Sequence, residues 1–167
     1  MKYLFIICIL FWNLTGITVA APDKTQVMEL LEGRHWKLDV ESFQLLGDET
    51  DKVLIEIGKD KSLINYLRFR ALHALSLFPT ENTASFLELY AENSFAPLAR
   101  RGFEALKNGF YKTQPQRVKR LAARLLKHPN AQVRISAARF MRSVDAPRFK
   151  RFLKSESDSW VRNEAQK

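Results

Sequence analysis

The sequence has 167 residues, with 27 Lys and Arg against 18 Asp and Glu, a formal net charge of +9 and one cysteine. A chain of this length suits one domain of ordinary size. Because the only cysteine is Cys8, inside the apolar N-terminal segment, the rest of the chain excludes a disulfide framework and thiolate metal sites.

The N-terminal segment has the order of a secretory signal. A basic start at residues 1–3 precedes an apolar run over residues 4–14, and small residues follow at 18–21. We expect residues 1–20 to be a signal peptide cleaved after Ala20, and the mature chain to be exported to a bacterial periplasm or secreted. The alternative is an uncleaved membrane anchor. The apolar run is shorter than the ~20 residues of a spanning helix and is interrupted by Asn13, so no transmembrane span is expected in the mature chain.

The remaining sequence predicts an all-α fold, because apolar residues recur at helical spacing and no stretch alternates with period two. Caps, glycines and prolines divide it into predicted helices. These are 24–32 before Gly33, 39–46 before Gly47, 48–57 capped by Asp48, 62–77 before Pro79, 81–92 capped by Thr80, one capped by Ser94 with Pro97 in its first turn, 115–127, 130–141 capped by Asn130, 145–153 opened by Asp145 and Pro147, and a last helix capped by Asp158. The short loops predict antiparallel packing of consecutive helices.

Two segments of the C-terminal half share one pattern. Residues 130–137 read Asn-Ala-Gln-Val-Arg-Ile-Ser-Ala, and residues 158–165, which start 28 positions later, read Asp-Ser-Trp-Val-Arg-Asn-Glu-Ala. The shared positions are Asn130, Val133, Arg134 and Ala137 in the first segment and Asp158, Val161, Arg162 and Ala165 in the second. Degenerate copies precede them at Leu67-Arg68 and Leu98-Ala99. A pattern that recurs along a chain indicates a stack of supersecondary units.

Residues 128–138 resemble the first helix of a HEAT repeat, in the shorter bacterial form also found in phycobilisome lyases. The resemblance implies a right-handed α-solenoid of antiparallel helix pairs over residues 62–167, with residues 21–61 as an N-terminal cap or eroded repeat. It implies that Arg134 and Arg162 are struts between repeats, and that the second helix of each pair lines the concave surface. Solenoid ends usually need a polar capping unit. The last helix is therefore expected to leave an apolar end that offers a homo-dimer contact.

Charge is divided unevenly along the chain. Residues 1–97 hold nine Lys and Arg against thirteen Asp and Glu, a net charge of −4, whereas residues 98–167 hold eighteen against five, a net charge of +13. The electrostatic field of a chain with so uneven a charge distribution attracts anionic partners. The candidate binding residues lie on two predicted second helices: Arg117, Arg120, Arg124 and Lys127 on the first, and Arg148, Lys150, Arg151 and Lys154 on the second.

The first of these two sets has a spacing of 3, 4 and 3, which aligns its members as one exposed stripe. Like charges at this spacing repel, and we expect the stripe to have no acidic neighbours that offset them. We therefore interpret the stripe as a binding surface. The alternative is a solvated face that keeps a basic protein soluble.

No catalytic motif accompanies this surface. His35, His73 and His128 lie far apart and belong to no metal-binding spacing, and the chain has no Gly-rich phosphate loop, Gly-x-Ser-x-Gly elbow or His-Glu-x-x-His. We expect no cofactor, metal or catalytic residue. The sequence predicts an exported, non-enzymatic scaffold that binds an acidic protein or an anionic envelope polymer. Nucleic-acid binding is a second hypothesis, and a lyase-like enzyme, suggested only by the relatives of the fold, is a third.

Overall fold

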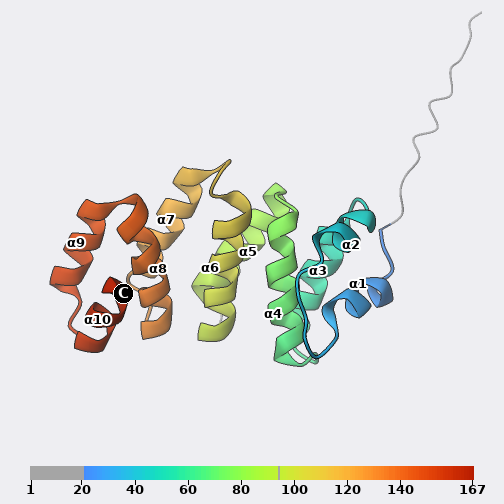
Figure 1. The fold of residues 1–167 in the computed structure, drawn as a ribbon, viewed down its shortest axis with the longest axis horizontal. Coiled ribbons are helices and arrows are strands. Elements are labelled where there is room, and N and C mark those ends of the chain that lie inside the picture. Colours follow the sequence, from blue (N-terminus) through green and yellow to red (C-terminus); the bar gives the residue numbers. More distant parts are fainter. Residues whose placement is uncertain (1–20, 94) are drawn as a thin grey trace, which may run out of the picture.

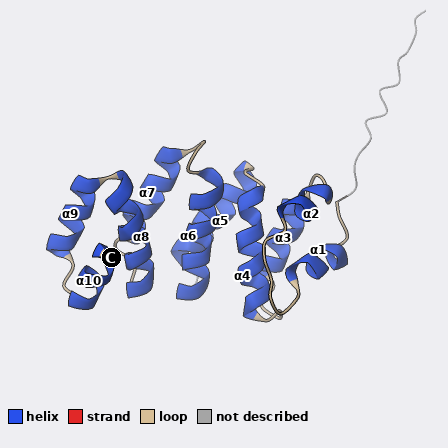
Figure 2. Ribbon diagram, viewed as in Figure 1, coloured by secondary structure: helices blue, strands red, loops and turns tan. Residues whose placement is uncertain are grey.

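The regular structure of this protein is helical. A computed structural model describes residues 21–93 and 95–167, and within these residues every regular element is an α helix or a 3-10 turn (Figure 2). The all-α prediction is confirmed for this part of the chain. The predicted signal peptide and Ser94 lie outside the described residues.

The helices follow one another along the long axis of the molecule, from α1 at one end to α10 at the other (Figure 1). The helices are α1 (Lys24–Leu31), α2 (Val40–Leu45), α3 (Thr50–Lys59), α4 (Asn65–Ala74), the 3-10 turn η1 (Leu75–Leu77), α5 (Glu81–Asn93), α6 (Ala96–Phe110), α7 (Pro115–Leu125), α8 (Ala131–Val144), α9 (Ala146–Ser155) and α10 (Ser159–Gln166). The two ends of the described chain therefore lie at opposite ends of the row.

Two sets of helices alternate along the chain and pack as layers. In the first-helix layer, α4 packs against α6, α6 against α8, and α8 against α10. In the second-helix layer, α3 packs against α5, and α5 against α7, while α9 follows in sequence and packs against α8. The predicted motif segments all belong to the first-helix layer, and both predicted cationic helices, α7 and α9, belong to the second.

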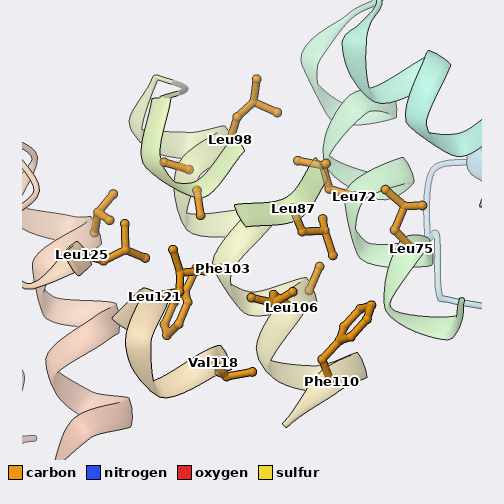
Figure 3. Packing of buried hydrophobic residues seen from close by; sticks show 14 of the residues in the cluster. Leu72, Leu75, Leu87, Leu98, Phe103, Leu106, Phe110, Val118, Leu121 and Leu125 are labelled. Atoms are coloured by element: carbon orange, nitrogen blue, oxygen red, sulfur yellow. The ribbon is translucent and has the colours of Figure 1, made fainter. Parts of the chain in front are cut away.

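The core is one continuous cluster that receives buried apolar side chains from all ten α helices of the described chain. In the middle of the molecule, Leu87, Phe103 and Leu121 fill the space between α5, α6 and α7 (Figure 3). Gly102 occupies the small-residue position of a degenerate motif copy. A Cβ atom there would lie 3.1 Å from the backbone oxygen of Leu87, so the absence of a side chain permits the close approach of α5 and α6.

Most of the predicted helix ends are confirmed. Gly33 and Gly47 follow α1 and α2 with φ values of 99° and 82°, a backbone conformation that glycine adopts without strain. The Oγ1 of Thr80 accepts a hydrogen bond from the backbone N–H of Thr83 at 3.1 Å, as the predicted cap requires. The side chains of Asn130, Asp145 and Asp158 also accept hydrogen bonds from the first turns of their helices.

Two predicted helix starts are wrong. Asp48 does not cap α3, because Glu49 has a left-handed φ of 70° and moves the helix start to Thr50. Helix α4 begins at Asn65 rather than at Ser62, because the Asp60 carboxylate accepts a hydrogen bond from the backbone N–H of Ser62 at 3.0 Å and holds that segment in a turn. Helix α6 begins at Ala96 after Phe95, which caps it without a side-chain hydrogen bond.

Candidate functional site

The two clear motif copies have matching geometry. Arg134 donates hydrogen bonds to the carbonyl oxygens of His128 and Pro129, both at 3.0 Å. Arg162 donates to the carbonyl oxygens of Glu156 and Ser157, at 2.6 and 3.0 Å, which are the residues at the same offsets. Each guanidinium therefore closes the turn that precedes its own helix.

Arg134 also links its helix to the turn that precedes α10. Its guanidinium binds the Glu156 carboxylate through two nitrogens, at 2.7 and 3.3 Å, and the Glu156 side chain is only 7% exposed. Burial by itself raises the pKa of Glu156, but the hydrogen bonds from Arg134 and from the Asp158 backbone lower this pKa below its ordinary value. Arg134 is thus a strut between two turns, and the contacts of Arg162 remain within its own turn.

Arg117 of α7 faces α5 and is 15% exposed at its side chain. It donates to Glu81 at 2.7 Å, to Glu88 at 3.2 Å and to the hydroxyl of Ser85 at 3.2 Å. The hydrogen bond to Glu81 raises the pKa of Arg117, and the same bond lowers the pKa of Glu81. Arg117 is therefore part of the packing between the two helices.

Arg124, about two turns further along α7, binds Glu92 and lies 3.9 Å from Glu88. The prediction of an unopposed stripe is wrong for Arg117 and Arg124, because carboxylates of α5 neutralise both. The sequence contains the signal for this arrangement, since Glu81, Glu88 and Glu92 are spaced 7 and 4 apart and share one face of α5. The residue pattern of α7 alone does not predict these ion pairs, because the acidic partners lie on α5.

The other predicted residues have different surroundings. Arg148 lies 3.7 Å from Asp145 at the start of α9. The remaining five are exposed, and none forms an ion pair with another residue of 21–93 or 95–167: Arg120, Lys127, Lys150, Arg151 and Lys154, which we name the α7–α9 cations. On α9, Phe149 and Phe152 are buried, so Lys150, Arg151 and Lys154 occupy its solvent-facing side.

The surface has hollows in both layers. Arg117, Arg120 and Arg124 line a hollow of about 530 Å³ at the start of α7, together with Glu88. A hollow of about 640 Å³ lies instead on the first-helix layer, between α4, α6 and α8, and we name it the α4–α6–α8 hollow. Arg100, Arg101 and Arg139 are among its lining residues. These three arginines are not among the predicted site residues, although Arg100 and Arg101 directly precede the small-residue position Gly102 in the same helix.

The histidines do not gather into a site. His73 packs edge-on against Trp36, with ring centroids 5.7 Å apart. Burial of the ring, and to a smaller extent the positive charge of Arg101, lower the pKa of His73. His128 sits in the turn before α8, where its Nδ1 accepts a hydrogen bond from the backbone N–H of Asn130 at 3.0 Å. Within the described residues, no group of three or more His, Cys, Asp or Glu side chains is arranged to hold a metal ion.

The C-terminal end of the helix row is mainly polar. Val161 and Ala165 of α10 are fully buried, and Trp160, 46% exposed, is the one large apolar side chain that α9 and α10 leave exposed in the described chain. The expected apolar end is therefore reduced to a single tryptophan. None of the helices in the described residues is both long and apolar enough to cross a bilayer.

The chain matches no protein-family model, no curated protein and no solved structure.

Proposed function

We propose that this chain is an exported, non-enzymatic α-solenoid of HEAT-like repeats that binds an anionic partner, an acidic protein or an anionic envelope polymer, through the α7–α9 cations. The repeat architecture draws support from the alternating packing of the two helix layers and from the matched hydrogen bonds of Arg134 and Arg162. Repeats of this kind present extended surfaces rather than closed pockets to their partners.

The single observation that carries the proposal is the contrast among the cations of the second-helix layer. Where a basic residue of α7 stabilises the fold, it has acidic partners, as Arg117 and Arg124 do. The α7–α9 cations have no ion pair within the described residues and are exposed. Lys150 and Lys154 are four residues apart, a spacing at which like charges repel. A bound polyanion would relieve this repulsion.

The binding test compares the purified wild-type protein with a variant in which three cations of α9 are replaced by glutamate. Poly-L-glutamate, polyphosphate and duplex DNA are the probes, each titrated over a range of salt concentrations. We expect binding that weakens with increasing salt, and we expect the variant Lys150→Glu/Arg151→Glu/Lys154→Glu to weaken it by about tenfold or more. Arg117 and Arg124 are left intact because their reversal would break the packing of α5 against α7.

A matched control reverses three exposed cations at the other end of the row, Arg34, Lys37 and Lys61, which also have no ion pair within the described residues. It changes the net charge by the same amount. If both triple variants weaken binding equally, only the total charge matters and the proposed surface is wrong. Preference for DNA over both other polyanions would favour the nucleic-acid hypothesis instead.

The proposed export rests on residues 1–20 and has its own test. Expression of the whole chain in a bacterium, followed by cell fractionation and intact mass measurement, should recover protein that begins at Ala21 outside the cytoplasm. Retention of the full mass in the membrane fraction would identify the segment as an anchor.

A further inference from the structure

The α4–α6–α8 hollow continues into a smaller one. The neighbouring hollow, of about 280 Å³, is lined by Trp36, Tyr66 and Phe69, and it shares His73 and Arg101 with the larger. The combined surface therefore runs from an aromatic end beside α1 and α4 to a polar end on α8. It lies on the first-helix layer and contains none of the α7–α9 cations.

The lining of this combined surface is cationic, with Arg70, Arg100, Arg101, Lys107 and Arg139 against Glu104 alone. Internal contacts occupy three of the five cations. Arg70 donates to the backbone carbonyls of Leu31 and Gly33, Lys107 pairs with Glu104, and Arg139 pairs with Glu164. Arg100 and Arg101 are exposed and form no ion pair with any described residue. Two adjacent guanidinium groups thus remain to bind carboxylates, for which their planar geometry is suited.

Uncharged groups beside these arginines match the backbone of a peptide. Asn108 and Gln132 line the larger hollow, are exposed, and make no side-chain hydrogen bond within the described part of the chain. A primary amide carries both donors and an acceptor, so it can pair with the N–H and the C=O of an extended chain.

The aromatic end provides an apolar contact of defined shape. The guanidinium of Arg70 lies over two rings, 5.2 Å from the centroid of Trp36 and 4.6 Å from that of Tyr66, and its attraction to both stabilises their arrangement. Arg101 lies 6.0 Å from the ring centroid of Phe69. An aromatic side chain of a ligand could contact ring faces and edges here, next to the exposed guanidinium of Arg101.

We infer that the combined surface binds an extended acidic peptide segment of a partner protein, with its carboxylates at Arg100 and Arg101 and an aromatic side chain against Tyr66. A duplex nucleic acid suits the surface less well, because its phosphate backbone offers no apolar group for the aromatic end formed by Trp36, Tyr66 and Phe69. This second binding site is independent of the proposed function of the α7–α9 cations.

The test measures binding of labelled peptides by fluorescence anisotropy at low salt. The probe is a short glutamate-rich peptide with one central phenylalanine. Its controls replace the phenylalanine by alanine or the glutamates by glutamine. We expect Arg100→Glu/Arg101→Glu to weaken binding of the probe by about tenfold or more. The variant Lys61→Glu/Lys112→Glu makes the same charge change at exposed cations that have no ion pair in the described residues and lie outside both proposed binding surfaces, and it should alter binding by less than about twofold. Thermal unfolding verifies that both variants remain folded.

Tyr66→Ala separates a specific site from general charge attraction. The wild-type protein should prefer the phenylalanine peptide to the alanine peptide, and Tyr66→Ala should remove that preference without abolishing binding. Equal weakening by both charge-reversed variants, retention of the preference in Tyr66→Ala, or no binding of the probe would overturn the inference. Displacement of the probe by equimolar duplex DNA, but not by unlabelled peptide, would overturn it as well. Repeating these measurements in the Lys150→Glu/Arg151→Glu/Lys154→Glu background distinguishes this site from the proposed function, because that background lacks the α9 cations and should still show the effects of the Arg100/Arg101 and Tyr66 variants.

Discussion

Helices α7 and α9 have similar cationic stripes over an apolar face, but their surroundings differ. On α7, Arg117 and Arg124 reach across to carboxylates of α5. On α9, Lys150, Arg151 and Lys154 are exposed and have no acidic partner in the described residues. The first stripe belongs largely to the fold, and the second is available to a ligand.

The difference originates in the neighbouring helices. Helix α5 packs against α7 and presents Glu81, Glu88 and Glu92 along one face. Helix α9 packs against α8, whose residues Ala131–Val144 include no Asp or Glu. The role of a cationic stripe on an amphipathic helix therefore depends on a helix about 30 residues away in the sequence, since Arg117 lies 29 and 36 residues from its partners Glu88 and Glu81.

The largest effect is expected where an arginine has the most buried acidic partner. Arg134→Ala would leave the Glu156 carboxylate, 7% exposed, without its bidentate partner and would open the turn before α8. Loss of one member of such a pair leaves an uncompensated charge, so we expect a loss of about 3 kcal/mol in the free energy of unfolding, measured by urea denaturation. Arg151→Ala on α9 is the control and should change stability by less than about 0.5 kcal/mol. Similar losses of stability in both variants would contradict the conclusion that the paired arginine stabilises the fold and the unpaired one does not.

The same pair predicts a pH dependence. The folded-state pKa of Glu156 lies below its ordinary value of 4.5, so the stabilisation is complete above that pH and is lost as the pH falls through the folded-state value. In Arg134→Ala the buried Glu156 carboxylate no longer has the hydrogen bonds from Arg134. Protonation then removes the negative charge, and with it the free-energy cost of burying that charge. The stability difference between wild type and variant should therefore narrow when unfolding is measured at progressively lower pH below 4.5. A difference that stays constant to acidic pH would assign the effect of Arg134 to its carbonyl contacts alone.

An intermediate effect is expected within α7 itself. Arg117→Ala removes hydrogen bonds to Glu81, Glu88 and Ser85 at the contact with α5, and we expect it to reduce stability by about 1 kcal/mol. Arg120→Ala, three residues later, should leave stability unchanged within about 0.5 kcal/mol. Thermal unfolding of the two variants provides the comparison, and a reversal of their order would show that the α5 contacts do not stabilise the fold.

The sequence predicts the helices well because local signals determine them. Thr80, Asn130, Asp145 and Asp158 cap helices from within one turn, and Gly33 and Gly47 occupy positions that need a positive φ. Where a local signal was ambiguous, the prediction was wrong. Asp48 has the chemistry of a cap, but the left-handed backbone at Glu49 places the helix start beyond its reach.

The candidate sites are less predictable because they depend on contacts between helices. The role of Arg117 is determined by Glu81, 36 residues away. The α4–α6–α8 hollow joins side chains of three helices that lie far apart in the sequence, such as His73, Arg101 and Arg139. Periodicity within a helix identifies its exposed face but not what lies opposite that face, so it cannot distinguish a neutralised arginine from one that is available.

The smallest effect concerns the unpaired stripe of α9. If Lys150 and Lys154 only repel each other, then Lys150→Gln/Lys154→Gln should stabilise the protein by about 0.3 kcal/mol at low salt. The gain should disappear at high salt, where the Debye length falls to about 3 Å. Arg117→Gln is the matched control, because it also removes a positive charge but should destabilise the protein at both salt concentrations. A loss of stability in the α9 variant would mean that these lysines have an acidic partner in the folded chain, and they would then belong to the fold in the way that Arg117 does.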